Sequence, residues 1–170
     1  MEKTRNTHSF KDDKAFLSNM YEAPFKMSLE YITPEKRDYF QKYFIFDNCW
    51  YPATENLYQA LKNKYMTGRN DFRYINPFES KKRGRLIHKN DVRFGWDVDR
   101  LIAMELVVDL KFNQHPNLFQ RLLTIPDEEL VEWNTWGDIF WGKCIKTNKG
   151  TNHLGEILKR KKYGKSTQKN

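Results

Sequence analysis

The sequence predicts a mainly α-helical α+β fold, with a single compact helical domain and a small β-hairpin in its N-terminal third. Its 170 residues, of which 39% are hydrophobic and 15% aromatic, are enough to bury one substantial core. From Pro52 onward, prolines and glycines divide the chain into helix-length segments with apolar residues at helical spacing. Before Pro52, short aromatic segments lack that spacing and predict strands.

The N-terminal third begins with a polar segment, residues 1–14, which we expect to be loosely held. Residues 34–38 then form a charged turn or insertion. Two aromatic runs, residues 44–46 and 49–51, flank the turn pair at positions 47 and 48 and predict a short hairpin.

A helix is predicted over residues 52–66, because proline suits the first turn of a helix. One face carries apolar and aromatic side chains that should be buried: Leu57, Tyr58, Leu61 and Tyr65. Glu55, Gln59 and Lys62 form a separate polar stripe, since they are spaced at i, i+4 and i+7. Gly68 should end this helix.

The remaining helices follow from similar signals. A basic helical turn is expected within residues 76–90, and Asp97 can cap a helix over 98–112 that is apolar nearly all round and should be central. Prolines start the segments 116–124 and 126–133. A last helix begins near 152–154. The expected domain therefore covers residues 15–158, followed by a basic tail, residues 159–170.

The net charge of +8 is concentrated in that tail, which has six positive and no negative charges. Subtracting these six from the 30 basic residues leaves 24 against 22 acidic residues, so the body is close to neutral. A second basic cluster covers residues 81–85. Two interpretations stay open for the tail: a solubilising segment, or a weak contact with nucleic acid.

Several classes of protein and site are disfavoured. No apolar run reaches the roughly 18 residues of a membrane-spanning helix, and no apolar block follows the start, so we expect a cytoplasmic protein. Cys49 and Cys144 form no metal pattern and should be reduced thiols. The four histidines lack ligand spacing, and phosphate-loop and nucleophile-elbow motifs are absent. Carboxylates and aromatic residues remain as the candidates for chemistry.

Residues 133–142 and 150–155 combine three of the five tryptophans, four glycines and one carboxylate, Asp138. This composition predicts a pocket for a flat heterocycle beside a stabilising negative charge. An aromatic mini-core with a turn explains it equally well. A pair of carboxylates elsewhere in the chain, Glu105 and Asp109, is either catalytic or paired with Arg100 or another cation.

Six segments, taken in order, resemble the YbiA-like, or NADAR, family of N-glycosidases. The matching segments are Phe16-Leu17-Ser18-Asn19 with Pro24-Phe25, the run from Tyr51 to Lys62, Gly84-Arg85, Trp96 with Met104 and Lys111-Phe112, Leu130 to Glu132 with Asp138 to Gly142, and Gly150-x-Asn152-x-Leu154-Gly155. The resemblance implies hydrolysis of the C1′–N bond of a ribosylated heterocycle by water, with no metal and no cofactor. Substrates of the family include phosphoribosylamino-pyrimidines of riboflavin synthesis and ADP-ribose on guanine bases.

Through the resemblance, Glu55 and Asp138 become the catalytic candidates. One would stabilise the oxocarbenium ion and the other would activate water. Trp96 and Trp141 would form walls for the base, and Lys62 and Arg85 would hold phosphate. The remaining expected substrate contacts come from Ser18, Asn19, Gln59, Gly142 and Asn152. Packing explains Trp96 and Asn152 equally well, and Trp133 and Trp136 are expected to serve packing.

The chain also departs from the family pattern. Many members have Trp-Gly-x-Gly where this chain has Trp141-Gly142-Lys143-Cys144, and the loop over residues 69–89 is long and basic. These features favour a polyanionic substrate, such as ADP-ribosylated nucleic acid, over a small intermediate. Two alternatives remain: a non-catalytic module that binds ADP-ribose or nucleic acid, and a sensor with an inactive pocket.

Overall fold

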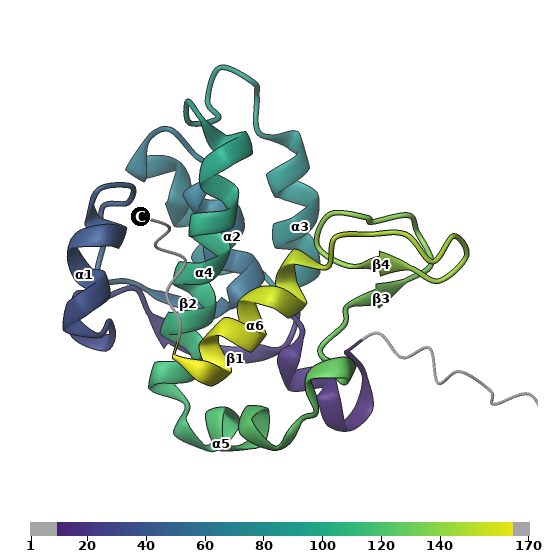
Figure 1. Ribbon diagram of the computed structural model, residues 1–170. Coiled ribbons are helices and arrows are strands. Elements are labelled where there is room, and N and C mark those ends of the chain that lie inside the picture. Colours follow the sequence, from purple (N-terminus) through teal and green to yellow (C-terminus); the bar gives the residue numbers. More distant parts are fainter. Residues whose placement is uncertain (1–9, 165–170) are drawn as a thin grey trace, which may run out of the picture. The chain divides into compact units, whose positions relative to one another are not determined.

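The computed structural model describes residues 10–164 and confirms the predicted mainly helical class with a small antiparallel sheet (Figure 1). These residues divide into two compact units. The central unit is residues 19–120, and the terminal unit combines residues 10–18 with 121–164. The division falls within helix α5 (Pro116–Thr124).

Helices make up most of the central unit. Its elements are β1 (Glu22–Lys26), the 3-10 helix η2 (Leu29–Tyr31), α1 (Pro34–Gln41), β2 (Trp50–Ala53), α2 (Thr54–Leu61), the 3-10 helix η3 (Met66–Arg73), α3 (Pro77–Leu86) and α4 (Trp96–Gln114). The predicted central helix is confirmed as α4, which begins at Trp96 and is buried continuously from Ala103 to Phe112. It packs against α2 and β1. Gly95, with φ of +77°, precedes it, so Asp97 lies in the first turn and is not the cap.

The predicted hairpin was wrong in its strand partners. Strand β2 pairs with β1, with Phe25 opposite Tyr51, whereas residues 44–49 form no strand. The turn at Asp47 and Asn48 does exist, because Asn48 has φ of +56° and Asp47 Oδ1 accepts the amide of Cys49 at 2.9 Å. The spacing of residues within one segment does not show which distant segment will pair with it. The sequence therefore predicted that residues 49–51 pair with the nearer aromatic run.

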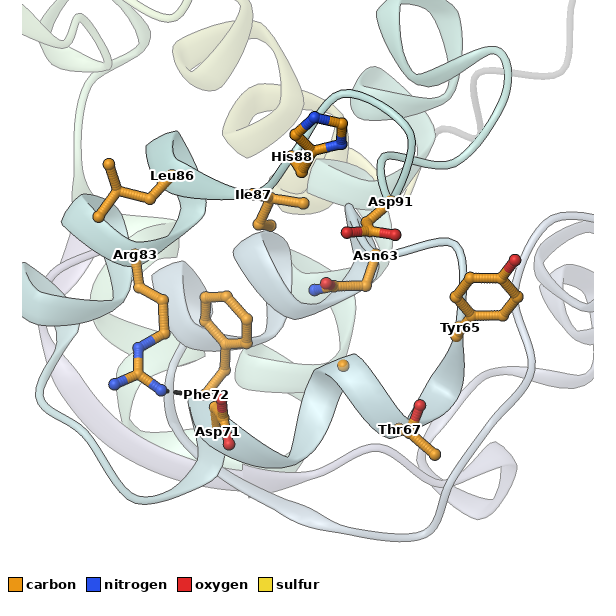
Figure 2. Close-up of a pocket in the computed structure, with 11 residues that line it drawn as sticks. Asn63, Tyr65, Thr67, Asp71, Phe72, Arg83, Leu86, Ile87, His88 and Asp91 are labelled. Carbon is orange, nitrogen blue, oxygen red and sulfur yellow. Dashed lines mark ion pairs between the residues drawn. The ribbon is translucent and has the colours of Figure 1, made fainter.

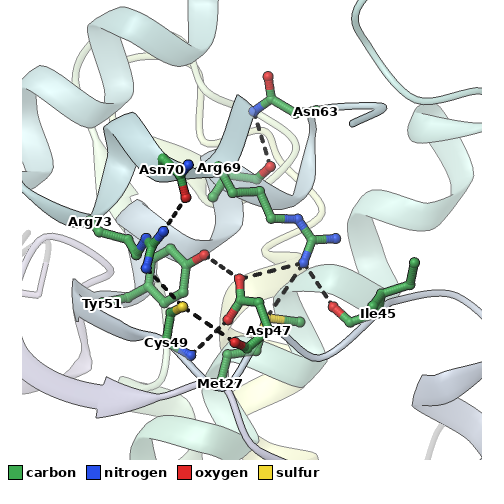
Figure 3. A network of polar contacts seen from close by, with 10 residues as sticks. Met27, Ile45, Asp47, Cys49, Tyr51, Asn63, Arg69, Asn70 and Arg73 are labelled. Carbon is green, nitrogen blue, oxygen red and sulfur yellow. Dashed lines mark hydrogen bonds and ion pairs between the residues drawn. The ribbon is translucent and has the colours of Figure 1, made fainter. Parts of the chain in front are cut away.

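A buried polar network fixes the loop before β2 (Figure 3). The hydroxyl of Tyr51 donates to Asp47 at 2.6 Å, and Arg69 from η3 pairs with the same carboxylate at 3.7 Å. Arg69 also donates to the carbonyl of Ile45 at 2.8 Å. Burial, followed by the hydrogen bond to Asp47, raises the pKa of Tyr51, so this phenol stays protonated.

Helix α2 is shorter than predicted. Pro52 belongs to β2, and the carbonyl of Asn19 caps the helix by accepting from the Glu55 amide at 3.0 Å and the Thr54 hydroxyl at 3.1 Å. The helix ends at Leu61, because the next residues pair with the loop over residues 91–93. Tyr65 therefore lies outside the helix and is 57% exposed, contrary to expectation, and Gly68 lies inside η3.

Glu105 and Asp109 form a structural ion pair with a residue that the sequence did not indicate. Lys36 of α1 places its ammonium nitrogen 3.2 Å from Glu105 Oε1 and 2.7 Å from Asp109 Oδ2. Both carboxylates are buried on α4. Lys36 is thus a cation that pairs with both carboxylates.

The terminal unit contains the remaining elements. They are η1 (Asp12–Leu17), the end of α5, η4 (Asp127–Glu129), β3 (Trp133–Asn134), β4 (Lys143–Cys144) and α6 (His153–Tyr163). The predicted helices over 116–124 and from 152–154 are confirmed, but the one over 126–133 is only the single turn η4. There Asp127 is held by Lys162 at 2.9 Å and by the Tyr163 hydroxyl at 3.0 Å.

The segments expected at the two ends lie only partly within the described residues. Residues 1–9 of the predicted loose segment and residues 165–170 of the basic tail lie outside them. Residues 12–14 belong to η1, and residues 159–163 to α6. Among residues 10–164, no helix is long and apolar enough to cross a membrane.

Candidate active site

Glu55 lies in the first turn of α2 and is only 6% exposed. One turn later, the side-chain amide of Gln59 donates a hydrogen bond of 2.8 Å to Glu55 Oε1. Burial raises the pKa of Glu55, while the hydrogen bond from Gln59 opposes that rise by favouring the ionised form. A buried carboxylate held by a donor is the kind of group that catalytic sites use.

Three cations surround this carboxylate. Lys81, Arg85 and Lys62 all lower the pKa of Glu55 by their positive charge, against the larger effect of burial. Lys81 and Arg85 are one turn apart on α3, and Lys62 follows the end of α2. Burial lowers the pKa of Lys62, although the charge of Glu55 opposes this. The structure thus brings together the predicted Glu55, Gln59, Lys62 and Arg85.

Lys81 was missed by the sequence analysis as a member of this group. It is one of six lysines and arginines that the sequence places between residues 81 and 93 without distinguishing them. Only the orientation of α3 decides which of its charges face Glu55. The buried residues Ser80 and Gly84 show which face of α3 is covered, and Lys81 and Arg85 flank that face on one side.

The polar stripe of α2 is therefore not a surface feature. All eight residues of the helix are buried, including the polar Thr54, Glu55, Asn56 and Gln59. Asn19 is part of the same arrangement, since its carbonyl caps the helix and its side-chain oxygen accepts from Thr54 at 3.2 Å. Its amide nitrogen lies 3.4 Å from the sulfur of Met104. The structure gives Asn19 a clear structural role, and its contact with substrate stays a prediction.

Trp96 packs beside this group. Its ring lies 5.3 Å from that of Tyr58, with an angle of 47° between the planes. Tyr58 shares a face of α2 with Glu55 and Lys62, because these residues are three and four positions away. Trp96 is buried at the start of α4, so packing accounts for it as well as a role in binding a base would.

In the terminal unit, Asp138 organises a tight turn. Its Oδ1 accepts the backbone amides of Phe140 at 3.0 Å and Trp141 at 2.9 Å. The side chain of Asn134 holds the backbone of the same residue, accepting from the Asp138 amide at 2.9 Å and donating to its carbonyl at 2.7 Å. One carboxylate oxygen therefore shapes the loop. Among the described residues, no hydrogen bond to the other oxygen is found.

The glycines of this segment permit close backbone packing. A Cβ at Gly142 would lie 2.0 Å from the carbonyl oxygen of Glu132, and one at Gly155 would lie 2.0 Å from that of Leu130. At Gly150, where φ is +146°, it would meet the carbonyl of Gly142 at 2.2 Å. These contacts explain the glycines without a ligand, and a substrate contact at Gly142 stays a prediction.

Asn152 serves the same packing. It adopts left-handed backbone geometry, with φ of 55°, immediately before α6. Its side chain accepts from the amide of Glu132 at 3.0 Å and donates to the carbonyl of Leu130 at 2.9 Å. Both groups of its amide are thereby occupied within the fold, which supports the packing interpretation.

The tryptophans of this loop differ in their surroundings. Trp141 is half-buried, with its ring 4.8 Å from Phe140 in an edge-on arrangement. Trp133 is half-buried in β3. Trp136 is 63% exposed, so the expectation that it serves packing was wrong. Ser18 follows η1 as its C-terminal cap.

The predicted site residues fall in both units. The central unit holds Asn19, Glu55, Gln59, Lys62, Arg85 and Trp96, and the terminal unit holds Ser18, Asp138, Trp141, Gly142 and Asn152. Within the central unit a charged group around Glu55 is assembled. The convergence of Glu55 with Asp138 stays a prediction.

An open pocket of about 410 Å³ in the central unit is separate from these candidates (Figure 2). It lies between η3 and the C-terminal part of α3, where Arg83 pairs with Asp71 at 2.9 Å. Its lining includes Tyr65, Phe72 and His88, and none of the predicted site residues. Among residues 10–164, no group of three or more histidine, cysteine or acidic side chains is arranged to hold a metal ion.

Comparison with known proteins identifies the family to which this chain belongs. The sequence model of the NADAR domain matches residues 6–162. The chain belongs to the NADAR family. N-glycosidase Npun_R5314 of Nostoc punctiforme is 35% identical over 121 residues, which cover 67% of this chain and 73% of that protein.

Two further relatives of this NADAR protein extend the match. N-glycosidase YbiA of Shigella flexneri serotype 5b is 29% identical over 154 residues, covering 90% of this chain and 82% of that protein. The NMR structure of the E. coli protein YbiA superposes with a TM-score of 0.69 at 25% identity, covering 92% of this chain and 81% of that one. The fold is thus that of YbiA.

Proposed function

We propose that this NADAR protein is an N-glycosidase that hydrolyses the C1′–N bond between a ribose phosphate or ADP-ribose and a nitrogenous base. The observation that carries the proposal is the buried carboxylate of Glu55 with Gln59 and three cations around it. Membership of the family and the N-glycosidase relatives support the same reaction.

Cleavage of this bond builds positive charge on C1′ and the ring oxygen of the ribose. A carboxylate in a site of low dielectric stabilises that charge more strongly than one in water. Water then adds to C1′ and loses a proton to a base, while the departing nitrogen takes up a proton. We assign these two carboxylate roles to Glu55 and Asp138, leaving open which residue has which role.

The cations suggest how the substrate is held. Lys62, Lys81 and Arg85 supply up to three positive charges beside Glu55, and phosphate groups bind such clusters through charge-assisted hydrogen bonds. Arg85 is exposed and therefore accessible to ligand. This concentration of charge favours a polyanionic substrate, so we place ADP-ribosylated guanine in nucleic acid ahead of a phosphoribosylamino-pyrimidine.

A substrate panel tests the proposal. Wild type, Glu55→Gln and Asp138→Asn would be incubated with DNA carrying ADP-ribosylated guanine and with phosphoribosylamino-pyrimidines, and release of the base measured by chromatography. We expect turnover of at least one substrate by wild type, and a loss of about 100-fold or more in each variant. Equal inactivity of wild type and both folded variants on the whole panel would contradict the proposal.

The alternative is a non-catalytic module that binds ADP-ribose or nucleic acid. The exposed cations of α3, Lys82, Arg83 and Arg85, are the observation in its favour. Truncation after Gly164 removes residues 165–170 but leaves α6 intact. Tight binding without turnover that survives both this truncation and high salt would favour the module, whereas non-specific binding through the basic residues 159–170 should weaken steeply with salt.

A further inference from the structure

Gly84 lies where α3 packs closely against Gln59 of α2. A Cβ atom built on this residue would lie 1.9 Å from Gln59 Oε1, 2.5 Å from its Cδ and 3.0 Å from its Cγ. No side chain fits in that space while Gln59 keeps its present position. Glycine is unfavourable in the interior of a helix, so its presence in the middle of α3 calls for a reason of this kind.

The same glycine also meets a second member of the charged group. Its carbonyl oxygen accepts a hydrogen bond of 2.8 Å from the ammonium group of Lys62. Gly84 therefore touches Gln59 of α2 and Lys62 directly after this helix, and both residues act on Glu55. Gly84 makes these contacts through its backbone alone, since glycine has no side chain.

The orientation of Gln59 depends on these contacts. Its Nε2 donates to Glu55 at 2.8 Å, but its Oε1 is buried and has no hydrogen-bond partner among the described residues. The bond to Glu55 fixes the amide nitrogen, and the oxygen side of the amide packs against Gly84. Displacing the amide would remove the donor from the carboxylate.

We propose that Gly84 is a positioning residue for Glu55: its missing side chain seats the Gln59 amide so that the amide holds the carboxylate in place. This inference rests on the proposed function in that Glu55 is its catalytic carboxylate. The contact itself is a property of the folded protein and is measurable without substrate.

The direction of the effect follows from the hydrogen bond. A donor to a carboxylate favours the ionised form, and burial opposes it. Replacing Gly84 with alanine forces Gln59 away, so Glu55 should take up a proton at a higher pH. Replacing Gln59 with alanine removes the same donor together with the three atoms that a new Cβ would meet.

The experiment is a double-mutant cycle on the full chain. The side-chain carboxyl carbon of Glu55 would be titrated by NMR in wild type, Gly84→Ala, Gln59→Ala and the double variant. Lys82→Ala, an exposed change on the same helix, serves as the control. Denaturant unfolding of all five proteins reports whether each is folded.

We expect the Glu55 titration to move to higher pH in both single variants and to be unchanged in Lys82→Ala. In the double variant it should match Gln59→Ala alone, because alanine at position 84 then meets no clash. Should Gly84→Ala fail to fold, the double variant should fold again, since the obstructing atoms are gone. An unchanged Glu55 titration in Gly84→Ala would overturn the proposal. So would a shift on introducing Gly84→Ala that is the same in wild type and in Gln59→Ala.

Kinetics separates this inference from the proposed function. On a substrate that wild type hydrolyses, Gly84→Ala should lower kcat by about 100-fold with little change in KM, as expected when a catalytic group is misplaced by about 1 Å. If the titrations are coupled but Glu55→Gln is fully active, Gly84 positions Glu55 and the catalytic assignment is wrong. If Glu55→Gln is inactive but the titrations are not coupled, the positioning role is wrong and the proposed function stands.

Discussion

The amide of Gln59 hydrogen-bonds Glu55 across one turn of α2, a helix in which all eight residues are buried. Burying a carboxylate costs free energy, and one hydrogen bond with surrounding cations offsets only part of that cost. The pKa of Glu55 is accordingly raised, with burial as the largest cause. A polar pair of this kind weakens the core, and the catalytic role that we propose for Glu55 would account for its presence.

We first predict how the free energy of unfolding of Glu55→Gln compares with that of wild type. The difference between the two proteins should favour the variant more at neutral pH than at acidic pH. In wild type the pKa of Glu55 is raised in the folded state. Ionisation of Glu55 therefore does not destabilise wild type below the ordinary pKa of about 4.3, and the destabilisation grows as the pH rises through the raised value. Glutamine carries no charge at either pH. Urea unfolding of both proteins between pH 4 and pH 8 measures the difference, with the exposed change Glu128→Gln as control. A difference that is constant with pH would contradict the prediction.

This helix also shows how far a sequence determines a site. Spacing placed Glu55, Gln59 and Lys62 on one face, and the resemblance added Arg85. Neither spacing nor the resemblance indicated that this face is buried or that Lys81 belongs to the group. Burial and helix orientation depend on the packing of α3 against α2. From the sequence, Gly84 was noted only as part of the Gly84-Arg85 segment that resembles the family. The atoms that explain it belong to Gln59, 25 positions away.

Predictions of the fold were likewise correct where the signal is local and wrong where the structure depends on distant contacts. Helix starts signalled by Pro116 and by the segment before α6 were correct, because those signals are local. The partner of β2 was wrong, since β1 lies more than twenty residues earlier. The helix predicted over 126–133 gave way to a single turn, in which Asp127 is held by contacts with the end of α6.

Our second prediction concerns the buried pair beneath α1. Lys36→Met should lower the free energy of unfolding by about 3 kcal/mol or more, because Glu105 and Asp109 are left buried without this cation. The pKa of Lys36 is raised, since the two carboxylates outweigh the opposing effect of burial. Denaturant unfolding at pH 7 gives the value. The matched control is Lys159→Met, which breaks the exposed pair with Glu156 and should cost no more than about 1 kcal/mol. Similar losses in both variants would count against the buried pair.

The third prediction separates the two roles of Asp138. Asparagine retains an oxygen that can accept from the amides of Phe140 and Trp141, whereas alanine removes it. Asp138→Ala should therefore lower the free energy of unfolding by about 1 to 3 kcal/mol, and Asp138→Asn by less. If the charge takes part in catalysis, both variants lose activity although Asp138→Asn remains folded. Full activity in Asp138→Asn would leave the residue with its structural role alone.

Our last prediction concerns Lys111, a fully buried lysine on α4. Its ammonium nitrogen lies 5.5 Å from the ring centre of Tyr21 and 5.4 Å from that of Phe112. Burial lowers the pKa of Lys111 from its ordinary value of 10.5 to about 7. Between these two values the unfolded chain binds more protons than the folded protein does, so lowering the pH through this range destabilises the fold.

Lys111→Met removes this dependence. Relative to the variant, wild type should lose up to about 1.4 kcal/mol of stability for each pH unit as the pH falls from about 10 to 7, and the difference should level off below pH 7. The comparison requires urea unfolding of both proteins across this range, with the exposed change Lys82→Met as control. Because other ionisable groups are common to both proteins, their contributions cancel. Parallel stability curves for wild type and Lys111→Met would mean that Lys111 is charged in the folded protein throughout this range.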